Sequence, residues 1–224
     1  MFARLPRVIA TLALVVTASA SLSFAAPTED ETKEGFVSLF DGESLKGWIG
    51  DTSGYQVEDG AIVCDKDGGG NIFTEGEYAN FVLRFEFKLE PAANNGLGIR
   101  APKDAGDVAY SGMELQILDD GHEVYKDIKP YQAHGSVYGI VPAKRGALKP
   151  TGEWNEQEVT CDGRTVKVVL NGKTIVDADL DEATKNGAMD GNEHPGVKRE
   201  TGHIAFLGHG TRVELRNLRV KELK

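Results

Sequence analysis

The stretch that most constrains the fold is residues 81–90 (FVLRFEFKLE), where apolar and charged side chains alternate. Every odd position is phenylalanine or leucine, and every even position from Arg84 onward is charged. A period of two places the apolar side chains on one face of an extended strand and the charged ones on the other. Pro91 ends the run, because proline cannot donate a hydrogen bond to a sheet. The pattern predicts a strand of an antiparallel sheet with one face toward a core.

The rest of the chain continues as short strands separated by turn residues. Asp59-Gly60 and Asn171-Gly172 each lie between apolar runs, and Asn-Gly can supply the two positive φ angles of a type I′ hairpin turn. In the last strand the apolar phase slips after Leu215, which predicts a bulge near Asn217. The sequence offers no stretch of about twelve residues with helical period and no phosphate-binding loop or nucleophile elbow. We therefore expect an all-β, antiparallel two-sheet jelly-roll sandwich.

Polar side chains recur on two of these strands. In residues 111–120 (SGMELQILDD) the apolar side chains alternate with Glu114 and Gln116, which would share the opposite face. In residues 94–100 (NNGLGIR) the same period would put Arg100 on one face, with glycines leaving room beside it. If the two strands are neighbours, Glu114, Gln116 and Arg100 can share a ligand-binding face. The alternative is an exposed polar face carrying a surface ion pair.

The N-terminal residues are not expected to belong to the fold. Residues 1–25 have a basic start, a short apolar run and small residues at their end, the pattern of a signal peptide. Residues 26–34 are acidic and polar and are predicted to be a flexible tether, and residues 35–224 to be the sandwich domain. The chain is therefore expected to be secreted or periplasmic, with a retained N-terminal anchor as the alternative.

Charge limits the classes of partner. The 25 lysines and arginines include two in the predicted leader, so 23 remain against 35 acidic residues, a formal charge of −12. Nucleic acids and anionic membranes would be repelled, so neither is expected as a partner. Cys64 and Cys161 lie in separate strand-like runs, and two cysteines without a spacing pattern leave open either a disulfide or two buried thiols. The oligomeric state is not indicated.

Several motifs, in their order along the chain, resemble the 3-keto-disaccharide hydrolase family, formerly a domain of unknown function. The resemblance covers residues 35–223 and is carried by residues 39–48 (LFDGESLKGW), 57–60 (VEDG), 95–100 (NGLGIR), 113–119 (MELQILD), 152–155 (GEWN), 170–172 (LNG), 208–210 (GHG) and 215–219 (LRNLR). It implies a sandwich related to concanavalin A and laminin G domains. It also implies action on a small carbohydrate substrate, a glycoside whose sugar is oxidised at C3.

The residues favour a mechanism with one carboxylate. A retaining glucanase needs two carboxyl groups about 5 Å apart, but the positions that share the face of Glu114 are Gln116 and Leu118. A 3-keto sugar has an acidic proton on C2, so one base, one oxyanion partner and one acid suffice. The candidates are Glu114 or His134 as base, Arg100 at the oxyanion or as substrate clamp, and His209 or Tyr138 as acid.

Asn95 and Gln116 are the candidates for binding sugar hydroxyl groups, and Tyr138 is a further candidate for substrate binding. Residues 121–150 and 181–199 form two long loops, which are uncommon in compact domains unless they build a site. No cofactor is expected. Ca²⁺ is a lesser possibility, because acidic residues occur nearby, although without a calcium-loop pattern: Asp104, Asp107, Asp119, Asp120 and Asp127.

Two other functions stay open at this point. A carbohydrate-binding module without catalysis would use the same polar face and aromatic side chains. An ordinary endo-glucanase would need a second carboxylate supplied by a loop. A panel of glucosides and their 3-keto derivatives would separate these functions from cleavage of 3-keto-glycosides.

Overall fold

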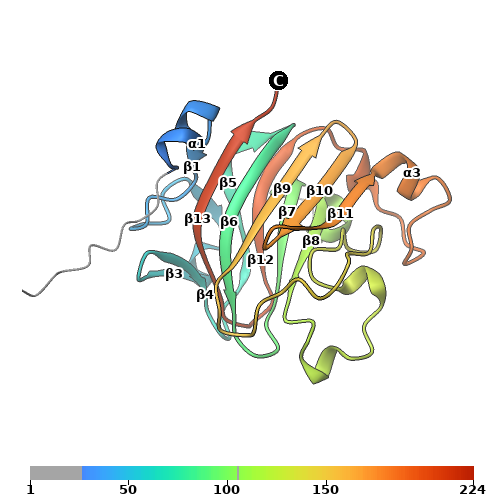
Figure 1. Ribbon diagram of the computed structural model, residues 1–224, viewed down its shortest axis with the longest axis horizontal. Coiled ribbons are helices and arrows are strands. Elements are labelled where there is room, and N and C mark those ends of the chain that lie inside the picture. The colour runs from blue at the N-terminus through green and yellow to red at the C-terminus, as the bar shows by residue number, and fades with distance from the viewer. Residues whose placement is uncertain (1–26, 105) are drawn as a thin grey trace, which may run out of the picture.

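A computed structural model describes residues 27–104 and 106–224, which form two antiparallel sheets packed face to face (Figure 1). This confirms the all-β sandwich predicted from the alternating strands. The predicted signal peptide, residues 1–25, lies outside the described residues. Among the described residues, no helix has the length and apolar character needed to span a bilayer.

The larger sheet, sheet A, has the order β11-β10-β9-β6-β13-β4-β3, and β1 pairs with one end of β13. Its strands are β1 (Val37–Ser38), β3 (Tyr55–Glu58), β4 (Ala61–Cys64), β6 (Phe81–Leu89), β9 (Asn155–Asp162), β10 (Thr165–Leu170), β11 (Lys173–Asp179) and β13 (Val213–Glu222).

The smaller sheet, sheet B, has the order β2-β5-β12-β7-β8. Its strands are β2 (Trp48–Gly50), β5 (Gly70–Tyr78), β7 (Asn94–Ala101), β8 (Met113–Leu118) and β12 (Gly202–Gly208). The last two strands of the chain, β12 and β13, each lie inside a sheet between strands formed much earlier in the sequence.

The core lies between the inner faces of the two sheets. Phe81, Leu83, Phe85, Phe87 and Leu89 of β6 all point into it, as their alternation predicted. Sheet B contributes the inward side chains of β7, β8 and β12, and the ring of Phe206 meets that of Phe85 edge to face at 5.8 Å. Burial of these apolar side chains is the main favourable term in folding.

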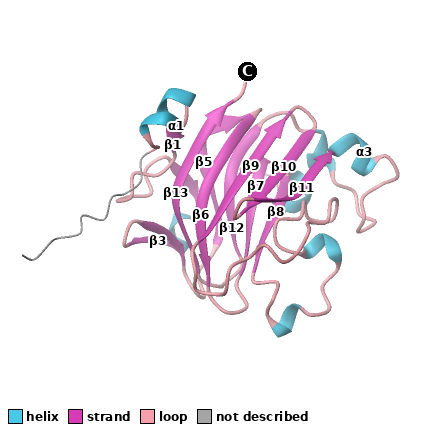
Figure 2. Cartoon of the chain, in the orientation of Figure 1, coloured by secondary structure: helices cyan, strands magenta, loops and turns pink. Residues whose placement is uncertain are grey.

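The helices are short and lie at the margins of the sandwich (Figure 2). They are α1 (Glu29–Glu34), α2 (Val108–Ser111) and α3 (Leu180–Thr184), with 3₁₀ turns η1 (Thr52–Gly54), η2 (Glu123–Tyr125), η3 (Pro130–Gln132) and η4 (Pro195–Lys198).

The predicted turns and bulge are present. Asn171 and Gly172 have φ angles of 48° and 77°, as a type I′ hairpin turn requires. In β13 the register with β6 shifts between Arg216 and Arg219, and Asn217 has a φ of 55°. Cys64 and Cys161 are both buried and free.

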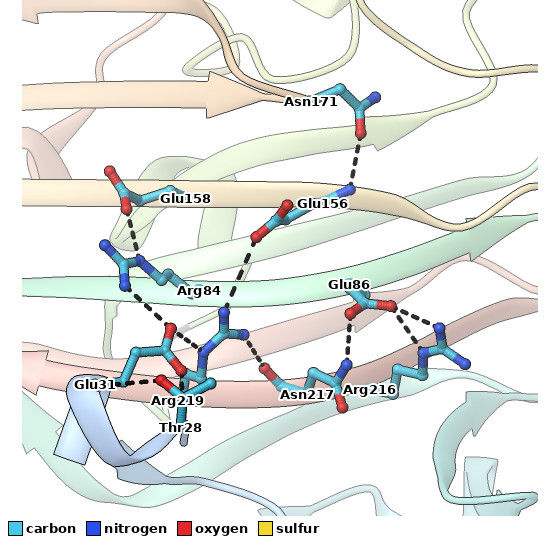
Figure 3. Close-up of polar contacts among 10 residues, drawn as sticks. All are labelled: Thr28, Glu31, Arg84, Glu86, Glu156, Glu158, Asn171, Arg216, Asn217 and Arg219. Atoms are coloured by element: carbon cyan, nitrogen blue, oxygen red, sulfur yellow. Dashed lines mark hydrogen bonds and ion pairs between the residues drawn. The ribbon is translucent and has the colours of Figure 1, made fainter. Parts of the chain in front are cut away.

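The N-terminal acidic segment differs from the prediction of a flexible tether. Residues 29–34 form helix α1, which begins with a capping box between Thr28 and Glu31 and ends at Gly35. Glu31 accepts hydrogen bonds from Arg84 of β6 at 3.0 Å and Arg219 of β13 at 2.7 Å, which fasten the helix to the outer face of sheet A (Figure 3). A helix of six residues is too short to show a period, but its Thr-x-x-Glu sequence carries the capping signal.

Candidate active site

The outer face of sheet B carries the predicted polar strand. In the pairing of β7 with β8, Gly98 lies opposite Glu114 and Gly96 opposite Gln116, while Leu97 and Leu115 lie opposite each other and point into the core. Glu114 and Gln116 therefore share the outer face, as the sequence predicted.

Glu114 is almost fully buried on this face, although it is a carboxylate. It is 6% exposed, and its Oε1 accepts no hydrogen bond from the described part of the chain. The carboxyl group lies over the backbone of Gly96, where a β carbon would overlap Oε1. A buried, incompletely paired carboxylate is costly, so this arrangement indicates a group held ready for a ligand.

His209 is the neighbour of this carboxylate. It lies in the turn after β12, and its Nε2 is 3.7 Å from Glu114 Oε1, close enough for an ion pair but too far for a hydrogen bond. Its side chain is 46% exposed. The Glu114 carboxylate raises the pKa of His209 above its usual value of 6.5, against the opposing effect of burial, and Asp107 adds to this rise. The site thus places a titratable imidazole beside a carboxylate.

Gln116 is fixed by its neighbour on β7. Its Nε2 donates to Oδ1 of Asn94 at 2.8 Å, and its Oε1 has no partner among the described residues. Asn94 is held in turn by Thr211, whose hydroxyl accepts from the Asn94 backbone N–H at 2.8 Å and donates to its carbonyl at 2.7 Å. Gln116 therefore presents a hydrogen-bond acceptor beside Glu114.

Tyr138 lies next to Glu114 in an irregular segment beyond β8. Its backbone N–H donates to the Glu114 carbonyl at 2.9 Å, and the preceding Val137 forms a bridge with the inward-facing Leu115. Alternation then directs Tyr138 to the outer face. Its hydroxyl oxygen accepts from Gln132 Nε2 at 3.2 Å, so its proton stays available to a ligand.

Arg100 is not part of this cluster, so the prediction that it shares the face of Glu114 is wrong. It has a φ of 49° in a bulge between β7 and β12 and is 2% exposed. Its guanidinium donates to the carbonyls of Ala79, Gly163 and Arg199 at 2.9–3.2 Å. The bulge turns the Arg100 side chain to the face opposite to the one that simple alternation predicts. There its hydrogen bonds connect loops at one end of the sandwich.

His134 is also absent from the outer face, contrary to its prediction as a candidate base. Its Nδ1 accepts from the backbone N–H of Leu118 at 3.2 Å, so Nε2 carries the proton shared with Gln157 Oε1 at 3.0 Å. The ring stacks on Phe87 at 4.9 Å, inside the core. Burial lowers the pKa of His134 to about 4. This histidine is a neutral link between β8 and β9.

Asn95, predicted to bind substrate, points into the core as well. It is paired with the inward-facing Ile117, is fully buried, and its Oδ1 accepts from the Gly96 N–H at 2.9 Å. The residue on the outer face is Asn94, one position earlier. The sequence carried the signal, because Asn94 is in phase with Gly96 and Gly98, and Asn95 is in phase with Leu97.

Three of the five acidic residues considered for Ca²⁺ have structural partners. Asp119 accepts from the N–H of Ala92 and the hydroxyl of Thr151, and Asp107 caps helix α2. Asp120 pairs with Arg145. Within residues 27–104 and 106–224, no group of three or more metal-ligating side chains comes together.

Comparison with known sequences identifies relatives over most of the chain. The profile of the 3-keto-alpha-glucoside-1,2-lyase-like domain matches residues 35–221. A 3-keto-disaccharide hydrolase of Bacteroides thetaiotaomicron is 30% identical, over 85% of this chain and 79% of that protein.

Solved structures share the architecture. A candidate glycosyl hydrolase of Parabacteroides distasonis superposes with a TM-score of 0.77 at 27% identity, over 89% of this chain and 99% of the other. The carbohydrate-binding module CBM66 of Bacillus subtilis has a TM-score of 0.54 at 12% identity, over 79% of this chain and 96% of that chain, and shares the fold alone.

Proposed function

Because the chain belongs to the 3-keto-alpha-glucoside-1,2-lyase-like family, we propose that it is an exported enzyme that cleaves 3-keto-glycosides at the outer face of sheet B. The observation that carries the proposal is the buried Glu114 carboxylate, whose Oε1 has no hydrogen bond within the part of the chain that the structure describes, with the imidazole of His209 3.7 Å away. A general base must be close to the proton that it removes, and an acid close to the leaving group.

In the first step the Glu114 carboxylate removes the proton on C2 of the sugar. The electrons of the C2–H bond form a C2=C3 bond, and the C3 ketone becomes an enolate. The hydroxyl of Tyr138 donates a hydrogen bond to the enolate oxygen. Its own oxygen already accepts from Gln132 Nε2, which leaves its proton for this bond. This takes over the role first expected of Arg100.

In the second step the enolate re-forms the ketone, a C1=C2 bond forms, and the bond from C1 to the aglycone oxygen breaks. His209 gives its proton to that oxygen and releases an alcohol. Water then adds across the new double bond: His209 takes a proton from the water as its hydroxyl bonds to C1, and Glu114 returns its proton to C2, so both side chains regain their starting states. The net reaction is hydrolysis, although the glycosidic bond is broken by elimination. This is consistent with the names of both relatives, a lyase-like domain and a hydrolase.

A C2-deuterated 3-keto-glucoside tests this mechanism. We expect the purified protein to release the aglycone, to show a several-fold lower kcat/KM with deuterium on C2, and to leave the unoxidised glucoside intact. Cleavage of the unoxidised glucoside without an isotope effect would indicate an ordinary glycosidase. Binding of either sugar without cleavage would indicate a carbohydrate-binding module.

A further inference from the structure

Glu114 and Gln116 form an acceptor edge of the site. Each has an oxygen that is buried and accepts no hydrogen bond from the described residues. They are two residues apart on β8 and point the same way, which places them about 6.6 Å apart along the strand. A ligand that satisfies both oxygens must bring two hydrogen-bond donors across that span.

The direction of the Gln116 amide decides what it can recognise. An amide offers two N–H donors and one carbonyl acceptor. Because Nε2 donates to Asn94 Oδ1 at 2.8 Å, Oε1 is the atom turned to the ligand. The backbone of Asn94 is held in place, since its N–H and carbonyl are both bonded to the Thr211 hydroxyl.

A ketone and a hydroxyl differ at such an edge. A hydroxyl can donate to Gln116 Oε1, whereas a ketone oxygen only accepts. A ketone there would leave both its own oxygen and Gln116 Oε1 without a hydrogen bond, which is unfavourable for buried groups. The donors of the site belong to other residues: the imidazole of His209, with Nε2 3.7 Å from Glu114 Oε1, and the hydroxyl of Tyr138, whose backbone N–H is bonded to the Glu114 carbonyl. When Glu114 lies at C2 of the sugar, Gln116 lies far enough along β8 to contact a hydroxyl on the opposite side of the sugar ring.

We propose that Gln116, oriented by Asn94, is a specificity-determining residue that accepts a hydrogen bond from the C4 or C6 hydroxyl of the keto sugar. This rests on the proposed function. The contact fixes which side of the ring faces Glu114, and it turns the ketone toward the donor residues.

The test measures kcat and KM of Gln116→Met with a 3-keto-glucoside and with its 4-deoxy and 6-deoxy analogues. We expect a fall in kcat/KM of about 10- to 100-fold with the parent substrate, mostly as a rise in KM. With the analogue that lacks the recognised hydroxyl, the wild type and the variant should be equal within about twofold. Gln56→Met, an exposed amide on β3 of the other sheet, is the matched control.

Asn94 variants test the orientation of the amide. Asn94→Asp can still accept from Gln116 Nε2 and should keep most of the activity, whereas Asn94→Leu should resemble Gln116→Met. Equal loss in Asn94→Asp and Asn94→Leu would overturn the proposal, because it would mean that Nε2 faces the ligand. The melting temperature of each variant separates these effects from unfolding.

The remaining outcomes are distinct. A Gln116→Met variant that turns over the parent substrate like the wild type, or that loses the same factor with both deoxy analogues, would overturn this inference and leave the proposed function standing. A wild-type protein that turns over no 3-keto-glucoside would overturn both.

Discussion

The outer faces of the two sheets carry similar polar side chains but satisfy them to different extents. On sheet A, Glu86 accepts from Arg216 and Asn217, and the neighbouring charges are paired in the same way (Figure 3). On sheet B, Glu114 has a histidine at 3.7 Å. Oε1 of Glu114 and Oε1 of Gln116 each accept no hydrogen bond from residues 27–104 and 106–224. Paired groups contribute to stability, whereas unpaired buried groups reduce it.

Two histidine–carboxylate pairs, His194 with Asp190 and His209 with Glu114, differ in the same way. His194 has Nε2 3.0 Å from Asp190 and Nδ1 3.2 Å from the carbonyl of Ala109, and both side chains are sealed from solvent. His209 makes one long contact with Glu114 and is half exposed. The first pair is complete as it stands. The second pair has hydrogen-bonding groups that a substrate can satisfy. A binding site differs in this way from a structural ion pair.

Neutralising one carboxylate on each face should give the largest difference between the two sheets. Glu114→Gln should lower kcat on a 3-keto-glucoside by about 10²- to 10⁴-fold, because the general base is lost, while the protein stays folded. Glu86→Gln should leave kcat unchanged and lower the free energy of unfolding by about 1 kcal/mol. Steady-state kinetics and urea denaturation of both variants decide this, and similar kcat values would remove Glu114 from the catalytic step.

Two glycines of β7, Gly96 and Gly98, allow a test of where the Glu114 carboxylate lies, with a smaller expected effect. Gly96→Ala should lower kcat by about 10²-fold, because the added methyl group displaces the Glu114 carboxylate by about 1 Å. Gly98→Ala meets Ala205 and Val108 at 3.0 Å and leaves Glu114 alone, so its effect should appear in the melting temperature and not in kcat. If Gly98→Ala proved the more damaging to kcat, the position assigned to the carboxylate would be incorrect.

On the paired face, Glu31 should contribute stability that depends on pH. Burial raises its pKa, but hydrogen bonds from Arg219, Thr28 and Arg84 outweigh this and lower it from 4.5 to about 2. Because the pKa is lower in the folded state, the contribution is complete above about pH 4.5 and is lost as pH falls toward 2.

The corresponding variant is Glu31→Gln. It should lower the free energy of unfolding by about 1–2 kcal/mol at pH 7, and the difference from wild type should shrink between pH 4.5 and pH 2. Urea titrations across this range measure it. A difference that does not change with pH would mean that the Glu31 charge is not responsible.

The smallest effect concerns the pKa of His209. Glu114 raises that pKa above 6.5, so in Glu114→Gln the imidazole should titrate closer to 6.5. Proton NMR of the histidine ring signals follows both titrations, with His134, whose pKa is about 4, as an internal reference that stays neutral above pH 6. An unchanged His209 titration would show that the two side chains do not interact in solution.

The sequence was sufficient to predict the sandwich fold, because period-two alternation and turn residues are local signals and the tertiary structure does not override them. The strand of Phe81 and the hairpin at Asn171 are examples. The same alternation placed Glu114 and Gln116 correctly, since β8 runs without a bulge. Helix α1 was missed because six residues are too few for a period to appear.

The rest of the site depended on features that alternation does not encode. Arg100 left the face because of one residue at positive φ. His134 was assigned to the site on the length of its loop alone, but that loop folds inward and the ring lies under Phe87. The contact between His209 and Glu114 joins residues 95 positions apart, and it could be proposed from the family resemblance but not from spacing.

The central position of β12 and β13 has a consequence for how the chain is made. Neither sheet is continuous until residues 202–222 are present, because β12 separates β5 from β7 and β13 separates β4 from β6. The ribosome must therefore have added residues 202–222 before either sheet can close and the native barrier to unfolding can form.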